Sequence, residues 1–337
     1  MTIRRLLVVR LGSLGDLVHT LPALAVVRRT LPDAEIDWLV DAVHRDFLEL
    51  VSGLTNVVVL EDRTFRAWLD VGRRLRARRY DLAIDFQGLI KSAALARLSG
   101  ARRVVGFDRA ALRESWAAPF YTEQAEVGEG HHVIVKNLAL ARSIGADAPG
   151  AWEFPLRDVQ SPVLTAMRAD GLGRFALLNC GAAWPNKRWP PERFGRIAAW
   201  LREQHGLDSV ALWGPHEAHL ADMVAETSGG AARVAPETRM ADLVAFSRAA
   251  AIMISGDTGP THIAAATGTP LVTLFGPTDP LRNGPWSSQD RSLSKYADCQ
   301  CHYQRQCRLG PDRWCLASID EAAVKSAIDE RLASRSA

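Results

Sequence analysis

A glycine-containing loop near the start of the chain carries a carboxylate that could act as a general base. Residues 10–16 join an apolar run to a helical segment, and Asp16 ends the loop three residues after Ser13. A carboxylate in this position could take a proton from an attacking hydroxyl group. It could equally serve as a cap at the helix N-terminus. The glycine spacing is Gly-x-x-Gly, which differs from the Gly-x-Gly-x-x-Gly of dinucleotide sites and weakens a nicotinamide hypothesis.

A second loop, residues 255–262, also follows an apolar run and opens a helix. Backbone N–H groups at a helix N-terminus attract anions. Thr258 and Gly259 are at the expected helix N-terminus, where they could bind a diphosphate. Asp257 and His262 flank this position, although Asp257 could simply brace the turn. One glycine-containing turn before a helix is a common feature. Two such loops in the two halves of the chain together favour a ligand site.

Two polar side chains follow apolar runs in the second half. Lys187 lies between two tryptophans and could place a positive charge on a phosphate, or be an ordinary surface lysine. Glu217 begins a helical segment and could accept hydrogen bonds from ribose hydroxyls, or only favour the helix N-terminus. Together, a lysine and a glutamate could bind the phosphates and the ribose of a nucleoside diphosphate.

Four of the five cysteines fall close together, at Cys299, Cys301, Cys307 and Cys315. Reduced cysteines at this density, beside His302, could hold a structural zinc or iron ion. Their spacing is not that of a standard Cys-x-x-Cys pair, so the presence of a metal stays open. Cys180, at the end of an apolar run, is expected to be a small buried side chain.

Apolar runs of strand length alternate with helical segments in both halves, which is typical of parallel sheets with crossover helices. We therefore expect an α/β protein with two doubly wound, Rossmann-like domains, at residues 1–155 and 156–337, separated within the proline-containing segment 146–162. Ligands of such sheets bind beyond the strand ends, so we expect a shared cleft. The expected strands are 6–9, 36–40, 57–60, 82–84, 103–105, 175–178, 209–212, 232–234, 251–254 and 271–275. The expected helices are 17–30, 42–51, 65–78, 89–98, 132–144, 193–204, 217–226, 240–248, 261–266 and 320–334.

The composition excludes several classes of protein. The 337 residues are 47% hydrophobic and 23% charged, as in ordinary globular domains and unlike disordered or collagen-like chains. A formal net charge of +3 does not indicate nucleic-acid binding. Arg10 and Asp16 interrupt the first apolar stretch too early for an export signal, and no apolar run is long enough to span a bilayer. We expect a cytoplasmic protein with reduced cysteines.

Basic residues are concentrated in one stretch of the first half. Between Arg63 and Arg113 there are thirteen basic residues and four acidic ones. Such a stretch can be a solvated helix face, and it can also meet an anionic partner.

Five motifs, in the same order along the chain, together resemble glycosyltransferase family 9, and within it the ADP-heptose:lipopolysaccharide heptosyltransferases of the heptosyltransferase I type. They are Gly-Ser-Leu-Gly-Asp16-Leu-Val-His-Thr-Leu-Pro, Asp85-Phe-Gln-Gly-Leu-Ile-Lys91, Lys187-Arg-Trp-Pro, Trp213-Gly-Pro-His-Glu217 and Asp257-Thr-Gly-Pro-Thr-His262. The cysteine-rich segment departs from this pattern.

The resemblance implies a GT-B fold, with the acceptor held mainly by the first domain and the nucleotide sugar by the second. It implies an inverting single displacement in which Asp16 is the general base. Ser13 would shape the acceptor site, and Arg113 would lie near the sugar and an acidic acceptor. The donor-binding residues would be Lys187 at the phosphates, Glu217 at the ribose, and the loop residues Asp257, Thr258, Gly259 and His262.

The partners implied by the resemblance are ADP-heptose as donor and the anionic inner core of lipopolysaccharide as acceptor, at Kdo or a first heptose. A lysine and a helix N-terminus could stabilise the leaving diphosphate, so no cofactor is expected for the chemistry. A peripheral contact with the cytoplasmic face of the inner membrane would follow. Two alternatives stay open: a nicotinamide-dependent oxidoreductase with Asp41 at the ribose, and a non-catalytic nucleotide-binding module in which Asp16 is only a cap.

Overall fold

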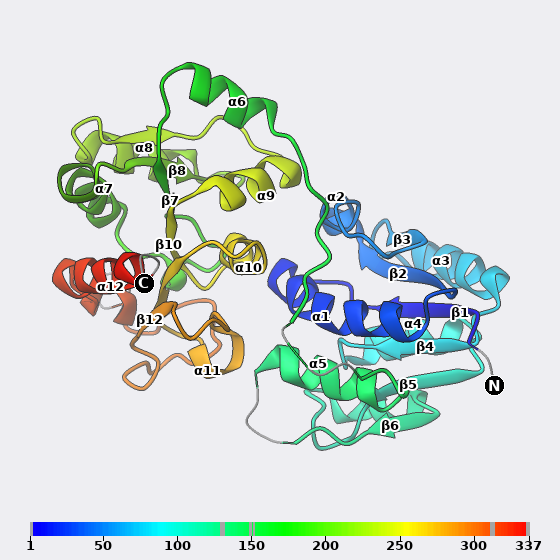
Figure 1. Cartoon of the computed structure of the whole chain (residues 1–337). Coiled ribbons are helices and arrows are strands. Elements are labelled where there is room, and N and C mark those ends of the chain that lie inside the picture. The colour runs from blue at the N-terminus through cyan, green and yellow to red at the C-terminus, as the bar shows by residue number, and fades with distance from the viewer. Residues whose placement is uncertain (1–2, 129–131, 148–149, 151, 311–313, 335–337) are drawn as a thin grey trace. The chain divides into compact units, whose positions relative to one another are not determined.

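Two parallel six-stranded sheets form the scaffold of the protein in the computed structural model, which describes residues 3–128, 132–147, 150, 152–310 and 314–334 (Figure 1). The chain divides into two units, Met1–Arg157 and Asp158–Ala337. This division falls two residues after the boundary expected from the sequence.

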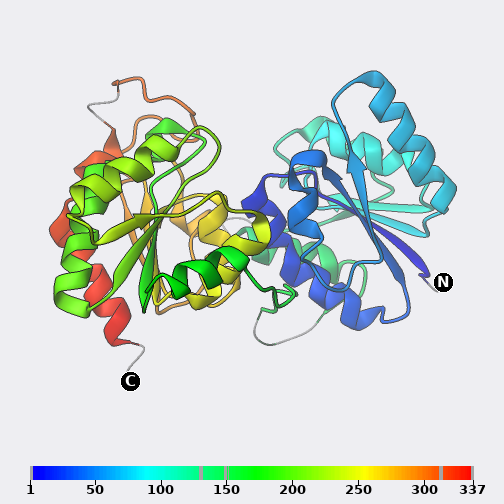
Figure 2. The same ribbon diagram turned by 90° about the horizontal axis from the view of Figure 1, so that it is seen from above.

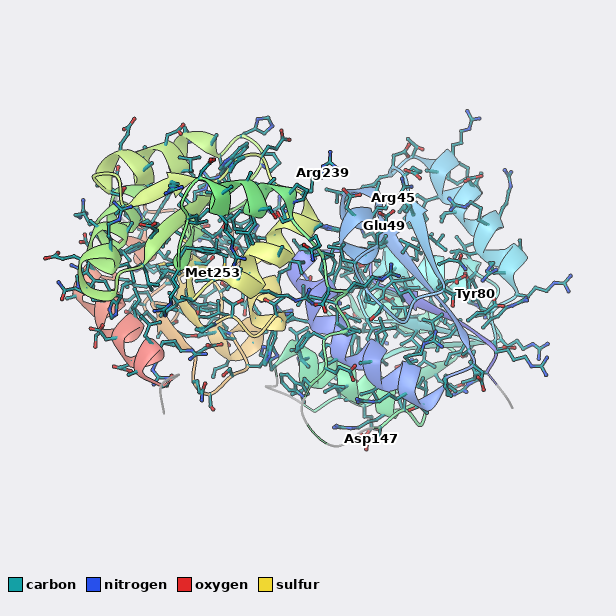
Figure 3. The ribbon with its side chains drawn as sticks, turned by 45° about the horizontal axis from the view of Figure 1, so that its top comes forward. Arg45, Glu49, Tyr80, Asp147, Arg239 and Met253 are labelled. Atoms are coloured by element: carbon teal, nitrogen blue, oxygen red, sulfur yellow. The ribbon has the colours of Figure 1, made fainter. Side chains whose placement is uncertain are left out.

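The sheet of the first unit has the strand order β3-β2-β1-β4-β5-β6. Its central strands are short apolar runs that are buried on both faces, as expected for a parallel sheet covered by helices. Tyr80, which precedes β4, is buried in this unit and donates a hydrogen bond to Asp37 Oδ2 at 2.7 Å (Figure 3). The strands are β1 (Arg5–Val9), β2 (Glu35–Asp41), β3 (Asn56–Leu60), β4 (Leu82–Asp85), β5 (Arg103–Phe107) and β6 (Glu123–Ala125).

Helices cover both faces of the first sheet (Figure 2). One layer is made by α1 (Leu14–Thr30) and α5 (Val133–Arg142), which pack against each other. The other layer is made by α3 (Phe65–Arg78), α4 (Ile90–Leu98) and the 3-10 segment η2 (Ser115–Phe120). Val71 of α3 and Leu95 of α4 share one buried cluster with strand residues such as Leu7. This layering brings the start of each helix to the edge of the sheet where the strands end.

The second unit repeats this architecture, with the strand order β12-β11-β10-β7-β8-β9. Met253 of β10 is fully buried inside it (Figure 3). The strands are β7 (Phe175–Asn179), β8 (Asp208–Leu212), β9 (Ala232–Val234), β10 (Ile252–Gly256), β11 (Leu271–Phe275) and β12 (Arg291–Ser294). The helices are α6 (Pro162–Ala169), η3 (Pro185–Lys187), α7 (Pro191–His205), α8 (Ala218–Thr227), α9 (Met240–Ala249), α10 (Gly259–Ala266), α11 (Pro280–Asn283), η5 (Cys315–Ser318) and α12 (Glu321–Ala333).

The predictions made from the sequence were wrong for two edge strands and for a few helical segments. Strands β6 and β12 were not anticipated, because edge strands are partly exposed and lack the apolar runs used to find them. The expected helix 42–51 is a 3-10 turn, η1 (Ala42–His44), followed by the four-residue α2 (Arg45–Leu48). Helix α6 was not expected; it begins at Pro162, the last residue of the segment 146–162. None of the helices in the described part of the chain is long and apolar enough to cross a membrane.

Candidate active site

Asp16 occupies the first turn of α1, directly after the loop that leaves β1. Its Oδ2 accepts hydrogen bonds from the backbone N–H and the hydroxyl of Ser13, both at 3.1 Å. The carboxylate therefore caps the helix, as the simpler hypothesis required. Its side chain is also 31% exposed, so a substrate hydroxyl can reach it. The capping role and a role as a base are compatible.

Arg10 holds the other oxygen of the same carboxylate. Its Nη2 lies 2.5 Å from Asp16 Oδ1, and its side chain is only 9% exposed. Arg10 also donates to the carbonyl of Phe86, and its own carbonyl accepts the indole N–H of Trp38 at 3.0 Å. A buried guanidinium at this distance forms a charge-assisted hydrogen bond with the carboxylate and restricts its rotation. The sequence analysis missed this residue, although a charged side chain directly after a buried strand was a usable signal.

A buried network from β4 supports the loop from behind. Gln87 Oε1 accepts the N–H of Leu11 at 2.8 Å, and Asp85 Oδ1 accepts the N–H of Gln87 at 2.9 Å. Asp85 Oδ2 accepts the hydroxyls of Ser92 and Tyr121, both at 2.8 Å. Burial raises the pKa of Asp85 and outweighs these hydrogen bonds, and burial likewise raises the pKa of Tyr121. The Asp85 motif thus positions the backbone next to Asp16.

His44, at the end of η1, lies near both Asp16 and Asp41, the last residue of β2. A Cβ atom on Gly12 would come 2.8 Å from His44 Nε2, so Gly12 is needed for this close packing. Burial lowers the pKa of His44, and the negative charges of Asp41 and Asp16 only partly offset this. Lys91 Nζ approaches Asp41 Oδ2 at 3.9 Å. Asp41 thus has a cationic neighbour within its own unit.

Arg113 is exposed, in the segment between β5 and η2. Within the described part of the chain it makes no side-chain hydrogen bond or ion pair. Its neighbour Glu114 accepts the N–H of Ile90 at 2.8 Å and ties this segment to the start of α4. The structure therefore brings Ser13 to Asp16 but does not link Arg113 to either residue.

In the second unit, Asp257 is the centre of a buried polar cluster after β10. Its Oδ2 accepts from Lys187 Nζ at 2.6 Å, Thr278 Oγ1 at 2.7 Å and Asn283 Nδ2 at 3.1 Å. Its Oδ1 lies 3.2 Å from His262 Nε2. Burial alone would raise the pKa of Asp257, but the hydrogen bond from His262 and the charge of Lys187 outweigh it, and this pKa lies well below the ordinary value. The cluster joins three of the residues expected at the donor.

Thr258 is the N-cap residue of α10, and its hydroxyl lies among other polar side chains. Asn179 Nδ2 donates to its Oγ1 at 3.0 Å, and Thr261 Oγ1 lies at the same distance. A Cβ on Gly256 would come 2.7 Å from the carbonyl oxygen of Lys187, so glycine permits the Lys187 segment to approach the strand. A lysine ammonium and the N-terminus of an eight-residue helix are thereby placed together, an arrangement that attracts a diphosphate.

Glu217 is the N-cap residue of α8, but its side chain makes no capping hydrogen bond and is held by Arg188 instead. Its Oε1 lies 2.8 Å from Arg188 Nη2, and its Oε2 accepts the N–H of Gly214 at 3.2 Å. Gly181 allows this approach, since a side chain there would collide with the carboxylate. Arg188 was not among the expected site residues. Only the fold shows that the end of β7 and the end of β8 meet at this carboxylate.

The cysteines of residues 299–315 are free thiols. Cys301 Sγ and Cys307 Sγ are 3.9 Å apart, and the N–H of Arg308 donates to Cys301 Sγ at 3.2 Å. Burial, and then the neighbouring Cys299, raise the pKa of Cys315 to about 12. Within the described residues, no group of three or more His, Cys, Asp or Glu side chains is arranged so that it could hold a metal ion. Cys180 is buried, as expected.

Comparison with known proteins places these residues in a family. Residues 68–312 match the model of glycosyltransferase family 9 (heptosyltransferase). Lipopolysaccharide heptosyltransferase 1 of Pseudomonas aeruginosa is 30% identical over 222 residues, which are 62% of this chain and 61% of that protein. Lipopolysaccharide heptosyltransferase 1 of Escherichia coli K12 is 29% identical over 234 residues, 66% of this chain and 72% of that protein.

Solved structures of the same family share the whole fold. The Escherichia coli heptosyltransferase WaaC with ADP superposes with a TM-score of 0.77 at 26% identity, covering 97% of each chain. A family 9 glycosyltransferase of Veillonella parvula has a TM-score of 0.83 at 22% identity over 99% of each chain. The two parallel sheets and their helices form the GT-B fold, as expected. The chain belongs to glycosyltransferase family 9.

Proposed function

We propose that this protein is an inverting heptosyltransferase that moves heptose from ADP-heptose to the inner core of lipopolysaccharide, at Kdo or a first heptose. The relatives from Pseudomonas aeruginosa and Escherichia coli K12 carry the name lipopolysaccharide heptosyltransferase 1, and WaaC has been solved with ADP and with a fluorinated ADP-heptose. Family membership also disfavours the oxidoreductase alternative, as does the pairing of Asp41 with Lys91.

The proposed reaction is one displacement at the anomeric carbon. Asp16 takes the proton of the acceptor hydroxyl, the acceptor oxygen forms the new C–O bond, and the bond to the diphosphate breaks from the opposite side, which inverts the centre. The leaving ADP carries the electron pair. The observation that carries this role for Asp16 is its partly exposed carboxylate, fixed by Arg10 and Ser13.

The second unit would bind the donor. Lys187 donates to the carboxylate and to the backbone carbonyl oxygen of Asp257, which leaves one of its three N–H bonds for the phosphates. The N-terminus of α10 adds backbone N–H groups. Thr258, Gly259 and His262 would line the same place, and Glu217 would accept hydrogen bonds from the ribose. In the first unit Ser13 and Arg113 would contact the acceptor, with Arg113 pairing with an acidic sugar.

The test measures ADP release and product mass together. Purified protein is incubated with ADP-heptose and truncated lipopolysaccharides that end before or after the first heptose. We expect ADP release that requires an acceptor, and a mass gain of one heptose on one of the two acceptors. Tight donor binding without acceptor-dependent release would support the non-catalytic module instead. A panel of other nucleotide sugars serves as the control for the donor, and preference for another sugar would contradict the proposal.

We further propose that the enzyme acts at the cytoplasmic face of the inner membrane through a peripheral contact, because the acceptor is a lipid. Cell fractionation tests this: the protein should sediment with inner membranes at low salt and be released at high salt. Recovery in the supernatant under both conditions would contradict it.

A further inference from the structure

The outer side of the α3/α4 layer combines apolar and basic side chains in an unusual way. Helix α3 faces the sheet with Val71 and Leu75, which are almost completely buried. Residues three, four or seven apart share one side of a helix. Phe65, Leu69 and Arg73 therefore share a side turned away from the sheet. Arg66 and Arg76 lie on the same side. Each is three residues from one of Leu69 and Arg73 and seven residues from the other.

The apolar members of this side are strongly exposed. Phe65 is 78% exposed and Leu69 is 43% exposed. Leu98, at the end of α4, is 42% exposed, and its Cβ lies 3.9 Å from the position a Cβ on Gly72 of α3 would take. The two helices thus form one continuous surface, the α3/α4 face, made of Phe65, Leu69, Leu98, Arg66, Arg73 and Arg76. Exposed apolar side chains that cluster on one face of a protein are typical of an interaction surface.

The charge on the α3/α4 face is mainly positive, since three arginines outnumber the one acidic neighbour on α3, Asp70, which lies four residues from Arg66 and three from Arg73. Within the described residues, Arg66, Arg73 and Arg76 have neither an ion pair nor a side-chain hydrogen bond. The one acidic residue of α3, Asp70, lies 4.0 Å from Arg74. The three guanidinium groups are therefore available to an anionic partner.

The combination of properties identifies the partner. Nucleic acid would use the arginines but would leave Phe65 and Leu69 exposed to water. An anionic bilayer can bind both the arginines and the apolar side chains. The apolar side chains enter the boundary between headgroups and acyl chains, and the arginines bind lipid phosphates. Figure 3 shows the side chains of α3 extending outward from the pale-blue helix. We infer that the α3/α4 face docks on a membrane surface rich in anionic phospholipid.

This placement fits the proposed function, on which its biological meaning rests. Strands β1 and β3 are in one parallel sheet and end at the same edge, so the starts of α1 and α3 lie there together. Asp16 is in the first turn of α1, and Phe65 is the first residue of α3. A membrane held by the α3/α4 face would present lipid-linked sugars at the edge of the sheet that carries the proposed base.

The experiment is sedimentation of the full chain with vesicles, without donor or acceptor. Vesicles of phosphatidylcholine alone are compared with vesicles containing phosphatidylglycerol. We expect binding only to the second kind, weakening as salt rises. The double variant Arg66→Ala/Arg73→Ala should lower the partition coefficient by roughly tenfold or more. Phe65→Ala/Leu69→Ala should lower it as well, because the apolar contribution is lost.

The matched control is Arg168→Ala/Arg174→Ala, which removes two exposed arginines of the second unit. It should bind vesicles like the unmodified chain. Equal loss in this control, no loss in the α3/α4 variants, or equal binding to both vesicle types would overturn the inference. Retention on DNA-cellulose without vesicle binding would do the same and would indicate a polyanion partner. Since the assay involves no sugar transfer, a chain that transfers heptose but does not bind vesicles refutes only this inference.

Discussion

Arg10 Nη2 lies 2.5 Å from Asp16 Oδ1, and the arginine is almost fully buried while the carboxylate is 31% exposed. The pair thus joins a fixed cation inside the first unit to an anion that a substrate can reach. Because Ser13 binds the second oxygen, the carboxylate has little rotational freedom left. This arrangement suits a base that must meet a hydroxyl in one orientation.

Replacing Asp16 by Asn should remove the carboxylate that accepts the proton while keeping the size and shape of the side chain. We expect turnover to fall by roughly 10² to 10⁴, the usual contribution of a general base, with the donor dissociation constant nearly unchanged. Acceptor-dependent ADP release and calorimetric binding of ADP measure the two quantities. Asp33→Asn, at an exposed position before β2, is the matched control and should retain full turnover. Full turnover in Asp16→Asn would eliminate the proposed base.

Replacing Arg10 should affect turnover through Asp16. Arg10→Met leaves the Phe86 carbonyl without its donor and the carboxylate without its cation, and we expect about 1 to 3 kcal/mol lower stability. Turnover should fall while the donor KM stays constant, because Arg10 belongs to the other unit. Arg10→Lys should recover part of the turnover, since the charge is kept. Equal turnover in the Met and Lys variants would show that Arg10 only fills space.

Replacing Lys187 by Ala should weaken stabilisation of the leaving diphosphate. Removing one such charged donor from an active site typically lowers turnover by roughly 10² to 10³. The same variant should bind ADP more weakly in calorimetry. Lys295→Ala, a lysine paired with Asp298 elsewhere in the second unit, is the control and should change neither quantity. Unchanged ADP binding in Lys187→Ala would separate this lysine from the phosphates.

Removal of divalent metal should leave the reaction intact, because Lys187 and the start of α10 supply the positive charge. We expect equal turnover with excess EDTA and with added Mg²⁺, measured by product mass. A loss of activity in EDTA that Mg²⁺ restores would contradict this expectation.

Acid should destabilise the second unit through Asp257. The folded-state pKa of Asp257 is depressed below the ordinary value of an aspartate, so its contribution to stability is fully present above the unfolded-state pKa and is lost as the pH falls towards the folded-state pKa. Urea unfolding from neutral pH downward should therefore show a loss of stability that sets in near and below pH 4. Asp257→Asn should be destabilised by about 3 to 5 kcal/mol at neutral pH, because Lys187 loses a buried partner. The acid-dependent loss should be smaller in this variant, and an equal loss would assign the effect to other carboxylates.

Local sequence patterns were sufficient to predict the α/β class, the two sheets and the loops that carry Asp16 and Asp257. A parallel sheet that is covered by helices on both faces buries its central strands. Short apolar runs are therefore expected to form those strands. The strands β6 and β12 escaped this logic, since an edge is partly solvated and its residues need not be apolar.

The partners of the site residues depended on the tertiary structure. Lys187 meets Asp257 across 70 positions, and Arg10 reaches the carbonyl of Phe86 across 76. A local sequence pattern cannot show which residues so far apart along the chain will meet. Their contact depends on which strands become neighbours and in what register. The same holds for the α3/α4 face: helical spacing groups Phe65, Leu69 and Arg73, but only packing of Val71 and Leu75 on the sheet turns that group towards solvent.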